Sequence, residues 1–229
     1  MAEAIKKPTL LPYHNESPDI MEVGIDEAGR GPLFGRVYTA AVVLPKDDSF
    51  DHSKMKDSKK FHSKQKITEV SEYIKQNALF WSITFADEKT IDDINILQAT
   101  QQAMHQAVSN IRAQSIDLPL SKYLLLVDGN YFKAYMRMNI DKGMLEQVQH
   151  LCIEGGDNKY SAIAAASILA KVARDDYIDE LCCNNPLLSS YYGLDTNKGY
   201  GTKKHMDGIK TYGITEWHRR SFAPCKDYC

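Results

Sequence analysis

Four acidic residues stand at the ends of apolar segments of this chain, where their chemistry needs an explanation. Asp26 and Glu27 follow Val-Gly-Ile, Asp128 follows Leu-Leu-Leu-Val, and Asp157 follows a Glu-Gly-Gly turn. An ionised carboxylate in such surroundings is costly unless it is paired. Several converging carboxylates without enough nearby Lys or Arg need divalent cations, and Mg²⁺ prefers oxygen ligands. Two such ions can activate a water and stabilise the leaving oxygen of a phosphodiester.

Taken one at a time, each of these acids is also typical of a turn or a helix cap, so the elements around them matter. Alternating or continuous apolar runs predict strands, and helical spacing of apolar residues predicts helices. We expect strands at 21–27, 36–44, 79–86, 122–127 and 148–153, and helices at 63–78, 91–114 and 161–173. This order favours an α/β or α+β layered domain with a mixed sheet, in which the acids lie at strand ends or glycine turns.

Composition narrows the class of protein. The 229 residues are 43% hydrophobic and 25% charged, which is typical of one globular domain with at most a small appendage and excludes wholesale disorder. No apolar run reaches the length of a membrane span, and residues 1–7 lack the apolar core of a secretory signal. The five cysteines are odd in number and lack Cys-x-x-Cys spacing, which indicates reduced thiols. We therefore expect an intracellular protein, cytoplasmic or, in a eukaryote, nuclear, with no membrane partner.

The chain divides into three parts. Residues 1–20 read as an extended, flexible N-terminal arm, residues 21–185 as the layered domain, and residues 186–229 as a helical, basic appendage. The net charge of −2 gives no global attraction to a polyanion. Residues 198–226, however, include seven Lys and Arg but only two acidic residues, and aromatic residues are interspersed among them. Such a segment is either a solvated face or a nucleic-acid surface.

The glycine-rich segment after the first strand decides between two functions. Gly29-x-Gly31-x-x-x-Gly35 misses the dinucleotide-binding spacing by one residue, and Pro32 interrupts the helix start that such a loop requires. The segment instead resembles the first motif of type 2 ribonucleases H, the ribonuclease HII family: a strand ending in Asp-Glu, then Gly-Arg-Gly-Pro. Further motifs of that family follow in order, namely Asp57-Ser58-Lys59-Lys60, Asp128-Gly129, Asp157 with 161–171 and Arg174-Asp175, and Lys198-Gly199-Tyr200-Gly201-Thr202 with His218-Arg219-Arg220-Ser221-Phe222.

The resemblance covers about residues 20–223 and carries definite expectations. It implies a ribonuclease H-like fold, with a mixed five-stranded sheet flanked by helices and a small helical C-terminal region that closes over a nucleic-acid groove. It implies a metal-dependent endonuclease that uses two divalent ions, Mg²⁺ or Mn²⁺. Its partners would be RNA–DNA hybrids and duplex DNA containing ribonucleotides, and its products would carry 3′-hydroxyl and 5′-phosphate ends.

The family's residue roles map onto matching positions. The resemblance makes Asp26, Glu27, Asp128 and Asp157 the catalytic, metal-binding carboxylates, with Asp175 and Asp176 as competitors for the fourth place. Adjacent strand residues face opposite sides, so Asp26 and Glu27 can share a site only where the strand ends or bends, as Gly29 allows. The remaining implied contacts are to substrate: Gly29, Arg30, Gly31, Lys59, Ser161, Ser167, Lys171, Arg174 and Tyr200. The glycine loop would read the ribose 2′-hydroxyl, Lys59 a phosphate, and Tyr200 the sugar at an RNA-to-DNA junction.

Two other interpretations stay open. A ribonuclease HIII-type paralogue lacks the tyrosine device and has an extra N-terminal domain, for which the first twenty residues are too short. A non-catalytic nucleic-acid-binding protein or complex subunit could keep the same fold, although four retained carboxylates disfavour it. The family also has members that need accessory subunits. No Gln-x-x-[Leu/Ile]-x-x-Phe-Phe sequence ends the chain, so docking on a sliding clamp is not expected.

Overall fold

A five-stranded mixed sheet organises the protein. The computed structural model describes residues 10–115, 118–139 and 143–228. The strands lie in the order β3-β2-β1-β4-β7, with β1–β2 and β2–β3 antiparallel and β1–β4 and β4–β7 parallel. Their bounds are β1 Met21–Ala28, β2 Val37–Val43, β3 Phe80–Ala86, β4 Tyr123–Asp128 and β7 Gln149–Ile153. The predicted mixed five-stranded sheet is confirmed, and its three parallel strands end at one edge.

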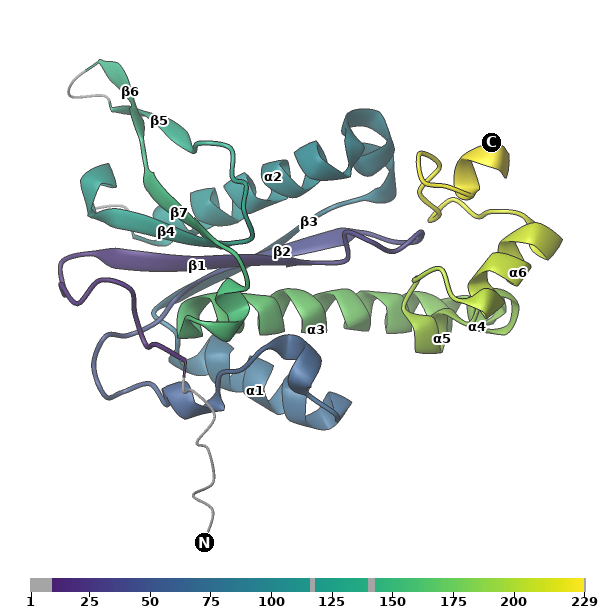
Figure 1. The fold of residues 1–229 in the computed structure, drawn as a ribbon, viewed down its shortest axis with the longest axis horizontal. Helices are drawn as coiled ribbons and strands as arrows, with labels where there is room; N and C mark the ends of the chain where they lie inside the picture. Colours follow the sequence, from purple (N-terminus) through teal and green to yellow (C-terminus); the bar gives the residue numbers. More distant parts are fainter. Residues whose placement is uncertain (1–9, 116–117, 140–142, 229) are drawn as a thin grey trace, which may run out of the picture.

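Helices cover both faces of the sheet (Figure 1). Helix α2 (Glu88–Gln114) lies on one face, and α3 (Ser161–Asn184) lies on the other with α1 (Lys64–Asn77) packed outside it. Alternation along the strands supplies both cores. Val23, Ile25, Leu125 and Val127 face α2, whereas Leu124 and Leu126 pack with Ile163 of α3. One strand therefore presents consecutive residues to two different helices, which fixes the side toward which each acid at its end points.

Helix α3 approaches β1 unusually closely because small residues meet there. A Cβ on Gly24 would lie 2.1 Å from the carbonyl carbon of Ala162, so only glycine fits. The alanine run 164–166 is fully buried beneath the sheet. The helix continues to Asn184, well past the predicted end at residue 173, because Ile178 and Cys182 are buried under the C-terminal region.

The C-terminal region packs on the glycine-rich turn that follows β1. Helices α4 (Pro186–Tyr192), α5 (Leu194–Asn197) and α6 (Lys203–Tyr212) share a core with Leu33 and Phe34 of that turn. An isolated antiparallel bridge joins Phe34 to His218. The 3-10 helices are η1 His52–Lys54, η2 Ser58–Lys60, η3 Leu120–Lys122, η4 Gly156–Asn158 and η5 Cys225–Tyr228. The last forty residues are thus tied to the end of the first strand.

Two segments differ from expectation. A hairpin of β5 (Met136–Asn139) and β6 (Met144–Gln147), missed by the sequence analysis, projects from the sheet (Figure 1). The expected flexible arm is anchored in its described part: Leu11 N donates to Lys159 O at 2.8 Å, and Ser161 N donates to Leu11 O at 2.9 Å. Residues 1–9 of that arm lie outside the described residues. Across residues 10–115, 118–139 and 143–228, no helix has the length and apolarity to cross a membrane.

Candidate active site

The parallel register brings Asp26 and Asp128 together. Ile25 pairs with Val127, so the next residue of β1 lies beside the next residue of β4 at the same edge of the sheet. Both acids are on the α3 face, because each follows the alternation set by Gly24 and Leu126. The Asp26 Oδ1 accepts a hydrogen bond from Glu27 N at 2.7 Å, and the Asp128 Oδ1 accepts one from Gly156 N at 2.6 Å.

The other two predicted carboxylates join from a strand end and a turn. Asp157 lies in η4, directly after β7, and its Oδ1 accepts a hydrogen bond from Asn158 Nδ2 at 3.0 Å. Glu27 is the penultimate residue of β1 and forms an ion pair with Arg30 at 3.3 Å. The strand stops one residue later, before Gly29 with its φ of 96°. This is the strand end that the sequence analysis required for neighbouring acids to share one site.

These carboxylates lie close enough for the charge of one to raise the pKa of another. Burial raises the pKa of Asp26 well above its usual value, and the charges of Glu27 and Asp128 raise it further. The pKa of Asp157 is raised by burial first and then by the charge of Asp128. Burial also raises the pKa of Glu27, although Arg30 opposes the shift. In the described part of the chain, none of the ion pairs involves Asp26, Asp128 or Asp157.

The donor set fits hard divalent cations in its chemistry. Every candidate ligand is a carboxylate oxygen, and three buried or half-buried acids share an edge without a cationic partner. Among the residues that the structure describes, no three His, Cys, Asp or Glu side chains converge closely enough to form a ready-made metal site. One oxygen of Asp26 and one of Asp128 is instead held by a main-chain N–H. Asp26, Glu27, Asp128 and Asp157 are the residues whose carboxylate oxygens would hold such ions.

A fifth acid, Asp57, belongs to this cluster and was missed. It lies in the Asp57-Ser58-Lys59-Lys60 turn, of which only the lysine was assigned a role. The Asp57 Oδ1 accepts a hydrogen bond from Lys59 N at 2.9 Å, and its Oδ2 accepts one from Asn158 Nδ2 at 3.3 Å. Its charge helps to raise the pKa of Asp157. The turn motif contained this residue, but only tertiary contact with η4 reveals that it shares the site.

The serines and the lysine assigned to substrate surround the acids from α3 and η2. The Ser167 hydroxyl lowers the pKa of nearby Asp26, and its Oγ hydrogen-bonds to Ser58 Oγ at 3.0 Å. Ser161 is fully buried, and its Oγ has no hydrogen-bond partner in the described structure. Lys59 is exposed, and its positive charge opposes the pKa shifts of Glu27 and Asp157. Ser167 is therefore a support for Asp26, while Lys59 is the cation free to meet a phosphate.

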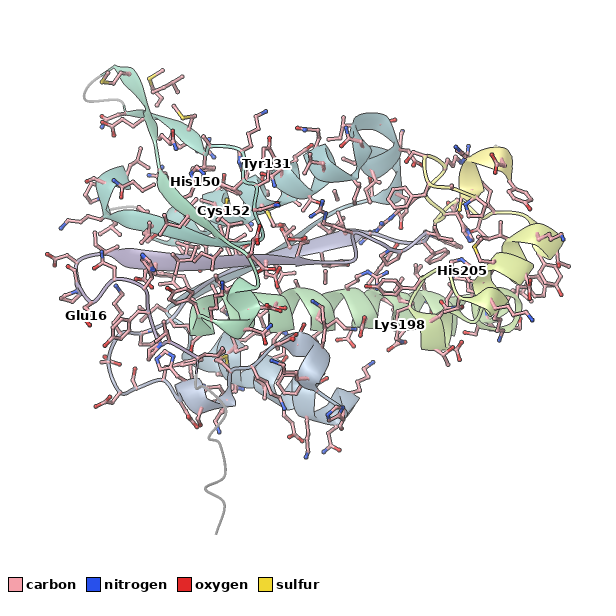
Figure 2. All side chains as sticks on the ribbon, in the orientation of Figure 1. Glu16, Tyr131, His150, Cys152, Lys198 and His205 are labelled. Atoms are coloured by element: carbon pink, nitrogen blue, oxygen red, sulfur yellow. The ribbon has the colours of Figure 1, made fainter. Side chains whose placement is uncertain are left out.

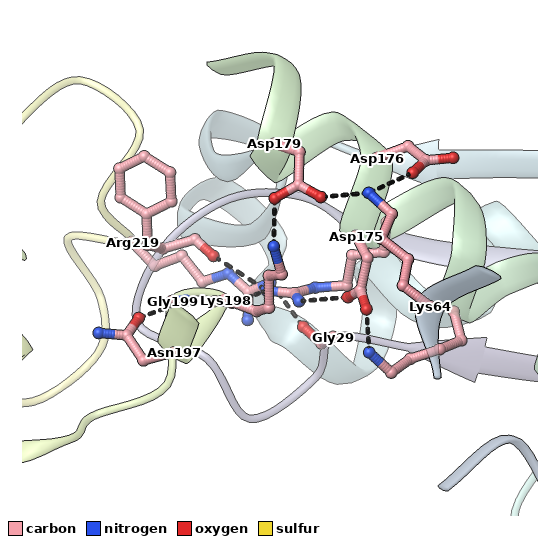
Figure 3. A network of polar contacts seen from close by, with 12 residues as sticks. Gly29, Lys64, Asp175, Asp176, Asp179, Asn197, Lys198, Gly199 and Arg219 are labelled. Carbon is pink, nitrogen blue, oxygen red and sulfur yellow. Dashed lines mark hydrogen bonds and ion pairs between the residues drawn. The ribbon is translucent and has the colours of Figure 1, made fainter. Parts of the chain in front are cut away.

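Two buried arginines hold the glycine loop (Figure 3). Arg219 has no exposed surface and donates from its guanidinium to four carbonyls, those of Gly29, Arg30, Pro32 and Gly35, at 2.6–2.9 Å. Arg174 is 2% exposed and donates to Lys198 O at 2.7 Å. A Cβ on Gly29 would lie 2.2 Å from Arg174 Nε. Arg174 thus supports the loop from below, and Arg219 was missed as a site-forming residue because a loop arginine shows no periodicity.

Tyr200 lies next to the loop, as a junction-reading residue should. Its side chain is 51% exposed, and its ring centre is 5.8 Å from the Arg174 guanidinium carbon. Its Cε1 would be 3.7 Å from a Cβ on Gly31. Gly31 itself is exposed. The structure therefore brings together Gly29-Arg30-Gly31, Arg174 and Tyr200, but Arg174 contacts the main chain rather than solvent.

The competing acids of α3 belong to a different network. Asp175 pairs with Lys171 and lies 3.8 Å from Arg174 Nη1. Asp176 pairs with Lys64 at 3.1 Å, and Asp179 bridges Lys64 and Lys198 (Figure 3). These acids form ion pairs, whereas Asp157 forms none in the described part of the chain. The charges of Asp128 and Asp57 raise the pKa of Asp157, and only the charge of exposed Lys59 opposes them. This geometry favours Asp157 as the fourth carboxylate and ties Lys171 to a structural ion pair.

Comparisons with known proteins agree with this geometry. The family model for ribonuclease HII matches residues 23–225. A ribonuclease HII of Phocaeicola vulgatus is 42% identical over 213 residues, which cover 93% of each chain. The ribonuclease H2 of Pyrococcus horikoshii has a similar fold, with a TM-score of 0.67 at 21% identity over 91% of this chain and 97% of that one.

A ribonuclease HIII also shares the fold at lower similarity. Bst-RNase HIII, solved in complex with Mn²⁺, superimposes with a TM-score of 0.63 at 18% identity, over 92% of this chain and 69% of its own. The high identity lies with the HII proteins, which resolves the choice between the two types. The chain belongs to the ribonuclease HII family of metal-dependent endonucleases, which degrade RNA in RNA–DNA hybrids.

Proposed function

We propose that this chain cleaves the RNA strand of RNA–DNA hybrids and single ribonucleotides in duplex DNA at the edge formed by β1, β4 and η4. The observation that carries the assignment is the set of neighbouring acids without cationic partners: Asp26, Asp128 and Asp157, with Glu27 beside them. Divalent metals serve the family, and these four carboxylates are the oxygen ligands that would hold two Mg²⁺ or Mn²⁺ ions.

The protein's own part in the reaction is positioning and charge. Two bound ions would activate the attacking water and stabilise the leaving oxygen, which yields 3′-hydroxyl and 5′-phosphate ends. The Ser167 hydroxyl would favour the ionised form of Asp26, because it lowers the pKa of that carboxyl. Exposed Lys59, whose charge reaches Glu27 and Asp157, would meet a backbone phosphate. Bare peptide groups at Gly29 to Gly31 can hydrogen-bond a 2′-hydroxyl, which restricts cleavage to ribonucleotides.

Tyr200 supplies a second level of selection. Its half-exposed ring lies beside Gly31, where it can pack flat on the sugar that follows the ribonucleotide. A 2′-hydroxyl on that sugar would crowd the ring and lose its water partners. We define the junction preference as the rate of cutting at one embedded ribonucleotide divided by the rate on a long hybrid. Tyr200→Ala should lower this ratio.

A cleavage assay tests the proposal. The purified chain is incubated with Mg²⁺ or Mn²⁺ and with a DNA duplex containing one ribonucleotide, next to a long RNA–DNA hybrid and an all-DNA duplex. Both ribonucleotide substrates should be cut, the DNA duplex should not, and EDTA should stop the reaction. Extension of the upstream product by a DNA polymerase would report its 3′-hydroxyl end. Binding without cleavage would instead support the non-catalytic interpretation.

The intracellular location, the boundaries 1–20, 21–185 and 186–229, and the absence of a clamp partner stay predictions. The hybrid-binding face is the partner surface that the family membership supports. Localisation of the tagged full-length chain in its own cells would check the first of these.

A further inference from the structure

Two buried histidines outside the carboxylate cluster contact each other. His205 lies in α6 and His218 follows that helix, and their Nε2 atoms are 3.1 Å apart. Their side chains are 0% and 1% exposed. Figure 2 shows His205 among the C-terminal helices, and the rings of Phe34 and Tyr192 pack edge-on against the pair. Neither histidine received a role in the sequence analysis.

The partners of the two rings determine where the protons lie. Thr215 N donates to His218 Nδ1 at 2.9 Å, so that nitrogen carries no proton. The main-chain carbonyl of Tyr200 lies 3.0 Å from His205 Nδ1 and can only accept, so His205 Nδ1 carries a proton. Neutral His218 must then hold its proton on Nε2 and donate it to His205 Nε2. The arrangement is satisfied only when both histidines are neutral, because a further proton would place two N–H groups face to face.

His205 contacts the Tyr200 carbonyl, in a segment that main-chain hydrogen bonds also hold. Tyr200 N donates to Asn197 O at 3.0 Å, and Leu33 N donates to Gly199 O at 2.9 Å. Tyr200 lies between Gly199 and Gly201, and Gly199 has a φ of 86°. Glycine neighbours leave the Tyr200 peptide with wide conformational freedom. In the described structure, the carbonyl accepts hydrogen bonds from Thr202 N at 2.7 Å and from His205. The tyrosine ring makes no side-chain hydrogen bond in the described structure, so its direction depends on its backbone and on its contacts with Arg174 and Gly31.

His218, the other member of the histidine pair, is fixed to the turn that carries the glycine loop. His218 forms a β-bridge with Phe34, and Arg219 N donates to Leu33 O at 2.9 Å. The next side chain, Arg219, donates hydrogen bonds to the loop carbonyls of Gly29 and Arg30. The histidine pair therefore connects the segment that presents the loop to the segment that presents the tyrosine.

We propose that the His205–His218 pair is a positioning device that sets the Tyr200 main chain, and with it the ring, relative to the loop at Gly29 to Gly31. The proposal rests on the proposed function of Tyr200 and assigns its support. The pair touches no reacting atom, so its effect is on which substrate is cut rather than on the hydrolysis itself.

Two substitutions of one residue separate the two hydrogen bonds. The amide nitrogen of His205→Asn can occupy the place of Nδ1 and still donate to the Tyr200 carbonyl, but it cannot reach His218. The amide of His205→Gln reaches the place of Nε2 and keeps the contact with His218, but it leaves the Tyr200 carbonyl without that donor. Both remove the imidazole from the same buried position, so each controls for the other.

We expect His205→Gln to lower the junction preference toward the value of Tyr200→Ala and His205→Asn to stay within about twofold of wild type. In a Tyr200→Ala background, the two variants should give the same ratio. An unchanged ratio in both variants, with activity falling only as the folded fraction falls, would overturn the proposal. It would then leave the function of Tyr200 intact.

Two measurements without activity keep the inference apart from the proposed function. Long-range ¹H–¹⁵N correlation spectra at pH 7 should show the proton of His205 on Nδ1 and that of His218 on Nε2. Amide hydrogen exchange at residues 199–202 should be faster in His205→Gln than in His205→Asn. A charged imidazole in either histidine, or equal exchange in the two variants, would refute the positioning role even if the chain cut no substrate. If both hold but wild type shows no cleavage, only the proposed function fails.

Discussion

The carboxylate edge and the glycine loop are neighbouring regions that handle charge in opposite ways. At the edge, Asp26 and Asp128 are adjacent acids, and neither forms an ion pair in the described part of the chain. Around the loop, the buried cation of Arg219 donates to four main-chain carbonyls. The first region is unsatisfied until cations bind, whereas the second is complete in the protein alone. The two regions thus differ in whether their charge is balanced within the protein.

The largest effect should come from Asp26→Asn. Loss of one ligand should reduce cleavage in Mg²⁺ by about 10³-fold. The same change should raise the stability of the metal-free protein at pH 7, because it removes a carboxylate whose pKa is raised in the folded state. Such a group destabilises the fold above its folded pKa, and this penalty fades as pH falls toward the unfolded value. Thermal melts from pH 7 to pH 4 in EDTA measure it.

Asp26→Asn therefore tests the contrast directly. Mg²⁺ should stabilise wild type more than the variant. A variant less stable than wild type at pH 7, or activity within tenfold of wild type, would show that Asp26 is a structural acid.

Asp157→Asn should have the next largest effect, with Asp175→Asn as its matched control. Asp157 lies among acids, and its loss should cost about 10²-fold in cleavage. Asp175 has Lys171 and Arg174 as partners, so its loss should act mainly through stability. Rates are compared at equal folded fraction. The reverse order would place the fourth carboxylate on α3.

Arg219→Lys should affect the loop region. A lysine ammonium cannot serve four carbonyls in the plane of a guanidinium, so buried acceptors lose partners. We expect a loss of about 3 kcal/mol in the free energy of unfolding and a roughly tenfold fall in kcat/KM. Urea unfolding and steady-state cleavage measure the two effects, and exposed Arg220→Lys serves as the control. No loss of stability would mean that the loop holds its shape without this arginine.

The last prediction concerns the pH dependence of stability that the histidine pair contributes. Burial, and then the neighbouring His205, lower the pKa of His218 to about 3. A histidine whose folded pKa lies below its unfolded value of about 6.5 stabilises the fold less as pH falls below 6.5. The contribution is at most about 1.4 kcal/mol per pH unit. His218→Asn should flatten the decline in unfolding free energy between pH 6.5 and 4, and parallel curves would contradict this.

The contributions of the carboxylate edge and of the histidine pair to stability therefore change with pH in opposite directions. Acid relieves the metal-free carboxylate edge and weakens the histidine pair. A stability profile of wild type with and without Mg²⁺ should therefore change shape as well as height.

The sequence predicted the five strands of the sheet better than the β5–β6 hairpin and the end of helix α3. Alternation and apolar runs placed β1 to β4 and β7 within a few residues, since each strand carries its own pattern. The β5–β6 hairpin was missed because four-residue strands of exposed side chains show no such pattern. Helix α3 was ended early because its last turns pack on residues distant in sequence.

The site divides in the same way. The acids were visible because an acidic residue after an apolar strand is conspicuous in one dimension. Asp57, Arg219 and the two histidines were not, because their hydrogen-bond partners lie on other segments, whether side chains or main-chain carbonyls. Motif resemblance drew attention to their segments without saying what each side chain does.

Helix α3 runs alongside β1 and reaches the glycine that follows it. Ala162 lies against Gly24, Ser167 beside Asp26, and Arg174 against Gly29, so one helix sets the spacing between the carboxylate edge and the glycine loop. An inserted residue between Ser167 and Arg174 would turn the far half by about 100° and advance it by about 1.5 Å. Such an insertion would break the register that places both Ser167 beside Asp26 and Arg174 beside Gly29.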